Sequence, residues 1–461
     1  MIILRLRSVS FCVIQSPTPT AHPGVLRKQQ LRKLTGSPDA DAPQTTMKTT
    51  TPKNKTEIRI PSKFTRRSIL VLKYRLPRAV VLALLAGLPV IVRAQDPSTE
   101  FVEPSTFDKL WDHATLYKDD TNPYFQEFKL RGRYQGQFWD VDADQGSESN
   151  YENRRIRLGF DAKFLEKKLE ARVEFGMDGE NGIFYDGLVD AYLRWKPKSW
   201  LSITAGKTKP LIAQYDWLES TNTQPTFERS QIFNQLGINR ATGLTVEGTT
   251  ADWSWRAGVY SNDTPNNTSG SGAFGDGEFG NFDGGTSCTL GVGYDFKHLL
   301  DLEKADFRLD WLHSDREAGD LEMNKYNDIV TTTFFVKEGY AAAVIEAFSA
   351  SGGDGNNSDV FGFYIQPLYD IIPKKLQLVG RYSYSNSDGP LGVQGQSRYE
   401  RTVATNKGLG DSYNAIYGGI QYFIYGDKLK LMAGAEWALI NNEKGDSYDG
   451  YTLLTGIRFS F

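Results

Sequence analysis

From Phe128 to the C-terminus, apolar and polar residues alternate with a period of two in short segments of the chain. The first segment, 128–138, places aromatic, aliphatic and glycine residues on one face and lysine, arginine and glutamine on the other. Successive side chains of a β-strand point to opposite sides, so this pattern predicts a strand with one apolar and one polar face. The same alternation occurs at 155–164, 169–175 and 189–195.

Twelve further segments continue the pattern and bring the expected number of strands to sixteen. They lie at 201–207, 241–249, 252–260, 286–296, 305–314, 328–337, 340–350, 359–369, 375–385, 413–424, 429–440 and 450–461. Short turns, such as 165–168 and 425–428, alternate with long polar loops, such as 140–153, 177–186 and 208–240. An even number of strands joined in this way is typical of outer-membrane barrels.

A soluble sandwich would have to bury these apolar faces against a second sheet, whereas a barrel closed against lipid satisfies every backbone group. We therefore predict an all-β fold, a closed antiparallel transmembrane β-barrel of about 16 strands over residues 124–461. The chain ends in a strand whose last residue is Phe461. A terminal phenylalanine is typical of the signal that outer-membrane assembly machinery reads.

The first 123 residues divide into three parts. Residues 1–65 form a polar, basic leader, with Met47 as an alternative start. Residues 66–94 predict a signal peptide, because arginines and lysines precede the apolar run 79–92 and small residues precede Gln95. The apolar run is too short to span a membrane comfortably. Residues 95–123 predict a periplasmic segment with a short helix around 107–116.

Composition narrows the class of protein. Aromatic residues make up 13% of the chain, yet its mean hydropathy is −0.44, which excludes a bundle of membrane-spanning helices. Residues 95–461 hold 36 of the 53 Lys and Arg and 53 of the 56 Asp and Glu, and this acidic body argues against nucleic acid as a partner. Cys288 is the one cysteine of the body, so no disulfide or cysteine metal site is expected there.

Basic residues gather on the polar faces of the first two strands. They are Lys129, Arg131, Arg133, Arg155 and Arg157. Neighbouring strands lie about 4.8 Å apart, so these side chains would form one positive wall suited to capturing phosphate or carboxylate. The alternative is structural pairing, because the next two strands carry Glu170, Glu174 and Asp190 on their polar faces.

The loop 208–240 is the candidate constriction, because the third outer loop of a sixteen-stranded porin folds into the barrel. Lys207, Lys209, Arg229 and Arg240 flank it, and Asp216, Glu219 and Glu228 lie within it. Opposed charges across a narrow pore would filter polar solutes. The alternative is that these charges are simply solvated.

Other chemistry is sparse. Asp140, Asp142 and Asp144 resemble part of a calcium loop, although Gly146 comes one place late, and a solvated acidic loop is the alternative. The chain has no Gly-x-Ser-x-Gly, His-Glu-x-x-His or P-loop motif. We therefore expect neither an enzyme nor a cofactor, although a catalytic triad assembled from distant residues leaves an outer-membrane hydrolase open.

The body resembles the phosphate-selective porins of the O and P family. The resemblance rests on LRGRYQGQF (130–138), NRRIRLGF (153–160), DAYLRW (190–195), AGKTKP (205–210) and WSWRAGVY (253–260). It implies a trimeric barrel with an inward third loop, a basic wall that Arg154 would join, and Lys207 and Lys209 at the constriction. We therefore expect a passive outer-membrane channel, surrounded by lipid, for small hydrophilic solutes such as phosphate. A structural or adhesive barrel that is closed to solutes is the alternative.

Overall fold

The computed structural model describes residues 105–178, 182–262, 279, 282, 285–315, 323–443 and 445–461. The predicted leader, the predicted signal peptide and the start of the 95–123 segment lie outside this part of the chain. Among the described residues, no helix is both long and apolar enough to cross a membrane.

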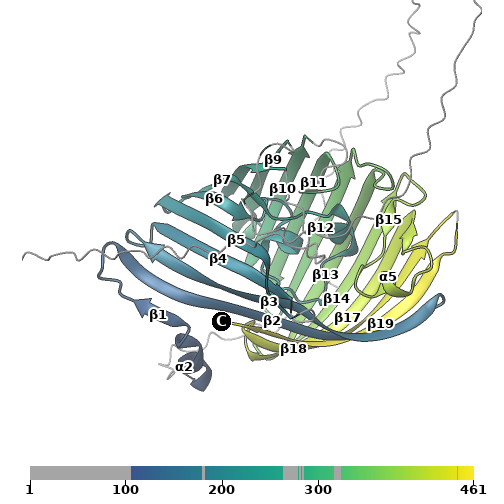
Figure 1. The fold of residues 1–461 in the computed structure, drawn as a ribbon, viewed down its shortest axis with the longest axis horizontal. Coiled ribbons are helices and arrows are strands. Elements are labelled where there is room, and N and C mark those ends of the chain that lie inside the picture. The colour runs from purple at the N-terminus through teal and green to yellow at the C-terminus, as the bar shows by residue number, and fades with distance from the viewer. Residues whose placement is uncertain are drawn as a thin grey trace, which may run out of the picture. The chain divides into compact units, whose positions relative to one another are not determined.

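Sixteen strands of the described residues form a closed antiparallel ring, in which each strand pairs with the next and β19 pairs with β2 (Figure 1). The strands are β2 (Phe125–Ala143), β3 (Gly146–Phe164), β4 (Leu169–Asp178), β5 (Ile183–Lys198), β6 (Leu201–Thr208), β7 (Ala241–Thr250), β8 (Trp253–Ser261), β9 (Thr286–Asp295), β10 (Lys304–Ser314), β11 (Asp328–Glu338), β12 (Ala341–Ser351), β13 (Val360–Ile372), β14 (Leu376–Ser387), β17 (Ser412–Tyr425), β18 (Leu429–Asn441) and β19 (Tyr448–Ser460). The predicted sixteen-stranded barrel is confirmed.

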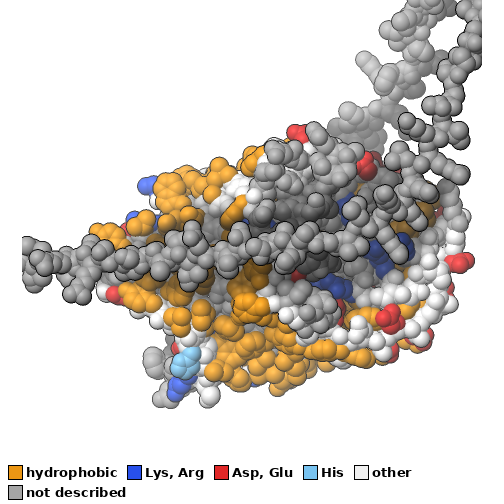
Figure 2. Space-filling view, in the orientation of Figure 1, with side chains coloured by type: hydrophobic (Ala, Val, Ile, Leu, Met, Phe, Trp, Pro, Cys, Tyr) orange, Lys and Arg blue, Asp and Glu red, His pale blue; other side chains and the backbone are white. Residues whose placement is uncertain are grey.

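The two faces of each strand meet different surroundings. On β19, Leu454 and Arg458 are almost fully buried inside the barrel, while Tyr451 and Leu453 point outward and are half exposed. Figure 2 shows hydrophobic side chains covering much of the outer face. This apolar belt would be unfavourable in water and is stable in lipid. The alternating pattern therefore specifies a barrel whose outer face is in contact with the membrane.

Two predicted loops are mostly strand. β2 and β3 run to Ala143 and Gly146, so the predicted loop 140–153 shrinks to the turn at 144–145. Trp139 and Val141 are buried on the inner face of β2, and Asp140 and Asp142 are exposed on its outer face. In the same way β4 and β5 take up most of 177–186. The prediction failed because strands that rise above the membrane carry polar residues outward, as loops do.

The acidic residues predicted to resemble a calcium loop lie in and just after β2. Two of them accept hydrogen bonds from the chain next to them. Asp142 accepts a hydrogen bond from the Tyr451 hydroxyl at 3.1 Å, and Asp144 accepts one from the Asp449 N–H at 3.1 Å. Among the described residues, no group of three or more His, Cys, Asp or Glu side chains is placed to hold a metal ion.

A helix and a short strand precede the barrel. Ser105 caps α2 (Thr106–Asp112), and β1 (Thr115–Lys118) pairs with β2 where β2 extends past the end of β19. Trp111 of α2 packs against Phe459, and its Nε1 donates to the Ser460 carbonyl at 2.6 Å. The C-terminal Phe461 exchanges two backbone hydrogen bonds with Gly132. The end of the chain therefore completes the barrel seam.

Gly159 of β3 has no room for a larger side chain in the barrel wall. A Cβ atom there would lie 2.1 Å from the Val173 carbonyl oxygen, which is backbone and cannot rotate away. We expect Gly159→Ala to destabilise the barrel by about 1–3 kcal/mol through overpacking and to slow its assembly. Gly418→Ala is the matched control, because a Cβ at Gly418 would meet nothing within 4 Å. The heat-dependent shift of the folded band on a denaturing gel measures both, and equal transitions would contradict the expectation.

Candidate constriction and solute site

Loop 3, which we define as residues 209–240, follows β6, precedes β7 and contacts opposite sides of the barrel wall. It contains η1 (Gln214–Leu218) and α3 (Gln231–Leu236). Arg133 of β2 donates to the Thr221 hydroxyl at 2.8 Å, while α3 packs against β12, β13 and β14. Loop 3 therefore runs across the lumen.

Apolar packing holds loop 3 against the barrel wall. Ile212, Trp217, Phe233 and Leu236 belong to one buried cluster with wall residues such as Phe348. Side chains of loop 3 consequently fill part of the lumen next to β10–β14, β17 and β18. Cavities remain beside the loop, and one of them is lined by β2, β4–β8 and β10.

Glu346 anchors the start of η1 from the opposite wall. Its fully buried carboxylate accepts the N–H groups of Tyr215 at 2.9 Å and Asp216 at 3.0 Å. The hydroxyls of Thr333 and Tyr364 also donate to it, at 2.6 and 2.9 Å. Sequence reasoning missed this residue, although a lone carboxylate on an otherwise small and apolar strand was a usable signal.

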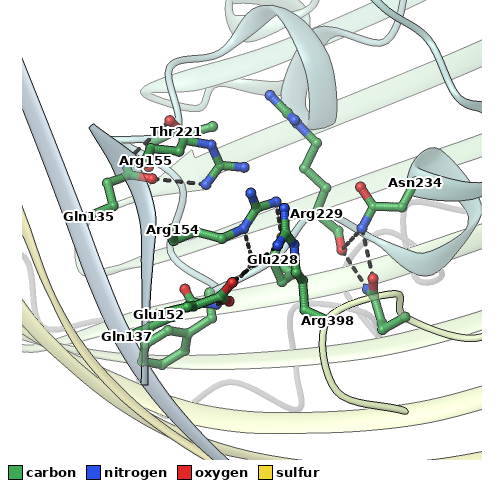
Figure 3. Close-up of polar contacts among 12 residues, drawn as sticks. Gln135, Gln137, Glu152, Arg154, Arg155, Thr221, Glu228, Arg229, Asn234 and Arg398 are labelled. Carbon is green, nitrogen blue, oxygen red and sulfur yellow. Dashed lines mark hydrogen bonds and ion pairs between the residues drawn. The ribbon is translucent and has the colours of Figure 1, made fainter. Parts of the chain in front are cut away.

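Glu228 anchors loop 3 between η1 and α3, and Figure 3 shows Arg154 and Arg398 pointing towards it. Arg154 donates twice to the Glu228 carboxylate, with Nε–Oε1 at 2.6 Å and Nη2–Oε2 at 2.9 Å. A register shift between β2 and β3 explains this geometry, because Gln135 pairs with Arg155 and Gly136 pairs with Asn153. The bulged Arg154 therefore turns inward beside Arg155. Burial alone would raise the pKa of Glu228, but the charge of Arg154 holds it below its ordinary value.

The indole of Trp217 collects three of the predicted cations. Lys209, Arg229 and Arg240 lie 5.3, 4.9 and 5.5 Å from its ring centroid. The Lys209 ammonium donates to the carbonyls of Leu218 and Glu219, at 3.3 and 3.0 Å, and so caps the end of η1. Burial, together with the charge of Arg240 and Arg229, lowers the pKa of Lys209 well below its ordinary value.

The acidic residues of loop 3 also have local partners. Asp216 is buried and accepts hydrogen bonds from the Ser230 N–H and hydroxyl, and burial raises its pKa. Glu219 is partly exposed, and Gln214 Nε2 lies 3.5 Å from its Oε1. Asp216 and Glu228 therefore stabilise the folded path of loop 3 through the hydrogen bonds that they accept.

A cavity of about 590 Å³ lies between loop 3 and the wall, and its lining is strongly basic. The basic lining residues are Arg131, Arg133, Arg172, Arg194, Lys196, Lys209, Arg240, Arg256 and Arg308, and the acidic ones are Glu174, Asp190 and Glu247. Five of the basic residues, Arg172, Arg194, Lys196, Arg256 and Arg308, were missed by sequence reasoning. Each of these five residues lies on the polar face of an alternating strand. The same position in the pattern identified Arg131 and Arg133.

Four of the seven residues predicted for the pore wall do not line this cavity, and neither does Arg229 of the predicted constriction. Arg155 and Arg157 are buried, where Arg155 donates to Gln135 at 2.9 Å and Arg157 to Glu174 at 3.0 Å. Lys129 is partly exposed near the start of β2. Lys207 is buried and pairs in register with Ala191 and Thr242.

Most basic residues of the cavity are paired with carboxylates. Glu174 accepts from Arg131 and Arg157, Asp190 pairs with Arg240 at 2.7 Å, and Asp310 pairs with Arg256 at 2.5 Å. Arg131 has a second carboxylate partner, Asp161, at 2.8 Å, and Asp161 also pairs with Arg172 at 2.7 Å.

Arg133 and Arg308 differ from the other arginines. Among the described residues neither has a carboxylate in ion-pair range, and their contacts are to hydroxyls of Thr221, Ser220 and Ser254. Nε of Arg133 and Nη1 of Arg308 have no hydrogen-bond partner in this part of the chain. Among the arginines of the cavity, these two therefore carry the least compensated charge.

The outer loop 388–411 provides a pH-dependent contact above the lumen. Glu400 of α5 (Glu400–Val403) is fully buried, accepts from Tyr413 at 2.8 Å, and lies near Glu436, which Tyr399 and Arg381 bond. Burial and the charge of Glu436 raise the pKa of Glu400 to about 8 from an ordinary 4.5.

The folded state therefore holds the Glu400 proton more tightly than the unfolded state does. Its stabilising contribution is complete below pH 4.5 and is lost as the pH rises through 8. We expect amide hydrogen exchange in 388–411, corrected for intrinsic rates, to accelerate between pH 6 and pH 9. Glu400→Gln should remove that acceleration, and an acceleration that persists in Glu400→Gln would assign it elsewhere.

A closed antiparallel barrel with an apolar outer face and a loop across its lumen defines an outer-membrane porin. The chain belongs to the phosphate-selective porin O and P family, whose model matches residues 128–461. It is thus a passive channel of the outer membrane, as the sequence resemblance predicted. No curated protein matches the chain.

Solved porin structures share the fold at low sequence identity. OmpF of Salmonella typhi, in complex with daunomycin, is 12% identical, with a TM-score of 0.52 over 75% of this chain and 100% of that one. OprB of Pseudomonas putida, at high pH, is 12% identical, with a TM-score of 0.50 over 72% of this chain and 94% of that one.

Proposed function

We propose that this porin passes small hydrophilic anions, inorganic phosphate among them, in preference to cations. The observation that carries the proposal is the lining of the 590 Å³ cavity, in which nine basic residues face three acidic ones. The chain outside the leader is acidic as a whole, so the basic lining of this cavity is a local feature. Guanidinium groups suit phosphate because they donate two parallel hydrogen bonds, and the family description agrees.

Ion selectivity tests the proposal directly. The purified porin in a planar bilayer under a tenfold KCl gradient should give a reversal potential on the chloride side. Inorganic phosphate should then reduce the chloride current in a saturable way. A reversal potential on the potassium side would contradict anion preference, and a bilayer without open steps would favour the closed structural or adhesive barrel.

Three further proposals complete the function. We infer export through the signal peptide at 66–94, recognition of the terminal strand with Phe461 by the assembly machinery, and a homotrimer in outer-membrane lipid. The sequence pattern supports the first two and the family resemblance the third. We also infer that the porin has no catalytic activity, which its family membership supports.

A further inference from the structure

A second cavity, of about 330 Å³, lies on the other side of loop 3 and shares no lining residue with the basic cavity. We call it the glutamine chamber, after Gln366 of β13, Gln377 of β14 and Gln421 of β17. The helix η1 lies between the two cavities, and a third cavity of about 320 Å³ shares lining residues with each of them. Gln214 and Leu218 line the basic cavity, whereas Tyr215 and Glu219 line the chamber.

The amides of the chamber have hydrogen-bonding capacity to spare. Gln421 is almost fully buried and donates its Nε2 to Gln377 Oε1 at 2.8 Å, while Gln377 donates its own amide to Asp370 at 2.8 Å. The Gln421 carbonyl oxygen is left without a hydrogen-bond partner among the described residues. Gln366 is 5% exposed and makes no side-chain hydrogen bond in this part of the chain. A buried oxygen without a partner is costly, so Gln421 Oε1 favours a ligand that supplies a donor, and the Gln366 amide offers that ligand a donor and an acceptor.

Aromatic rings form the rest of the chamber wall. Tyr215, Phe335, Tyr364 and Phe423 line it, and the rings of Tyr215 and Phe335 lie 5.0 Å apart. Rings beside a few amides suit a molecule with an apolar C–H face and hydroxyl groups at its edge.

The charges of the chamber do not favour an anion. Asp216, Glu219 and Asp427 line it with a single basic residue, Lys304. Asp427 pairs with Lys430 at 2.9 Å and Lys304 pairs with Asp306 at 3.2 Å, so both are compensated locally. The site is therefore close to neutral and slightly acidic, unlike the basic cavity.

We propose that the glutamine chamber binds a neutral, polyhydroxylated solute of monosaccharide size, separately from the anions in the basic cavity. Its volume lies at the small end of the range for ligand pockets, which matches a single sugar ring. The porin would then carry two classes of solute on the two sides of η1.

D-Glucose is the probe for the test. We expect it to reduce the chloride current of the full-length porin in a planar bilayer by more than the change in bulk conductivity, and to saturate. Gln366→Leu with Gln421→Leu keeps side-chain volume but removes both amides, so the half-saturating glucose concentration should rise about tenfold. Phe423→Leu, which leaves all three glutamines in place, should weaken binding independently and keeps the test decisive if the double variant does not assemble.

The matched control is Arg133→Gln in the basic cavity, because Arg133 lines neither the glutamine chamber nor the third cavity. It should shift the reversal potential and leave the glucose effect unchanged, whereas the glutamine variants should do the reverse. A glucose effect that follows bulk conductivity alone, or that is equal in the wild type and the glutamine and Phe423 variants, would overturn the proposal. Because glucose is uncharged, that result would leave the proposed anion preference standing.

Discussion

Replacing Arg133 and Arg308 together by glutamate should move the reversal potential in a KCl gradient to the potassium side. These arginines line the cavity and contact only hydroxyls, so each substitution changes the charge of the lumen by two without leaving a carboxylate unpaired. Two unit charges a few ångströms from a passing ion interact by several kcal/mol at an effective dielectric constant of about 20. We therefore expect a drop in the chloride-to-potassium permeability ratio of at least about tenfold.

The control is Lys374→Glu, which makes the same charge change at an exposed turn between β13 and β14. It should leave the reversal potential within error of the wild type, because bulk salt screens charges outside the lumen. If Lys374→Glu and the double variant shift the potential equally, the cavity does not set selectivity.

Arg157 is a poorer choice for this experiment, although the sequence places it on the same wall. Its Nη1 lies 3.0 Å from Glu174 Oε1, and both side chains are about 5% exposed. Removing one member of a buried pair costs about 3–5 kcal/mol. A loss of selectivity in an Arg157 variant would then be confounded with misfolding.

The sixteen strands were predictable because the membrane imposes a simple rule on each of them. A residue faces either lipid or lumen, so the period of two appears within a single strand such as 128–138 and needs no knowledge of its neighbours. The rule is reversed above the membrane, where Asp140 and Asp142 lie on the outer face of β2 while Trp139 and Val141 are buried on its inner face. For this reason the sequence predicts a long loop at 140–153, where the structure has the hairpin of β2 and β3.

The interior of the barrel was predictable only in part, because it depends on contacts between distant segments. Polar faces pointed to Arg131 and Arg133, but the same signal on β8 and β10 was not used for Arg256 and Arg308. The bulge that turns Arg154 inward, and the carboxylate of Glu346 beneath η1, depend on register and on the path of loop 3. A pattern within one strand contains neither.

Removing the Glu228 carboxylate should release the part of loop 3 between η1 and α3 from β3. In Glu228→Ala the Arg154 guanidinium loses both of its carboxylate bonds while remaining largely buried, near the charges of Arg155 and Arg229. We expect a loss of about 3–5 kcal/mol in the free energy of unfolding and a larger, noisier single-channel conductance. The heat-dependent gel shift and single-channel recording measure the two effects.

A double-mutant cycle separates the tether from general packing. Arg154→Met alone and Glu228→Leu alone should each be as harmful as Glu228→Ala, because each leaves one charge buried without its ion-pair partner. In Arg154→Met, Gln137 still donates to the Glu228 carboxylate at 3.1 Å. Arg154→Met with Glu228→Leu removes both charges and should recover most of the stability, since an apolar pair can replace a buried ion pair at little cost. Conductance should recover with it only if packing alone can hold loop 3 in place. A double variant that is stable but still noisy would show that the ion pair positions the loop, whereas additive losses would show that the two side chains act independently.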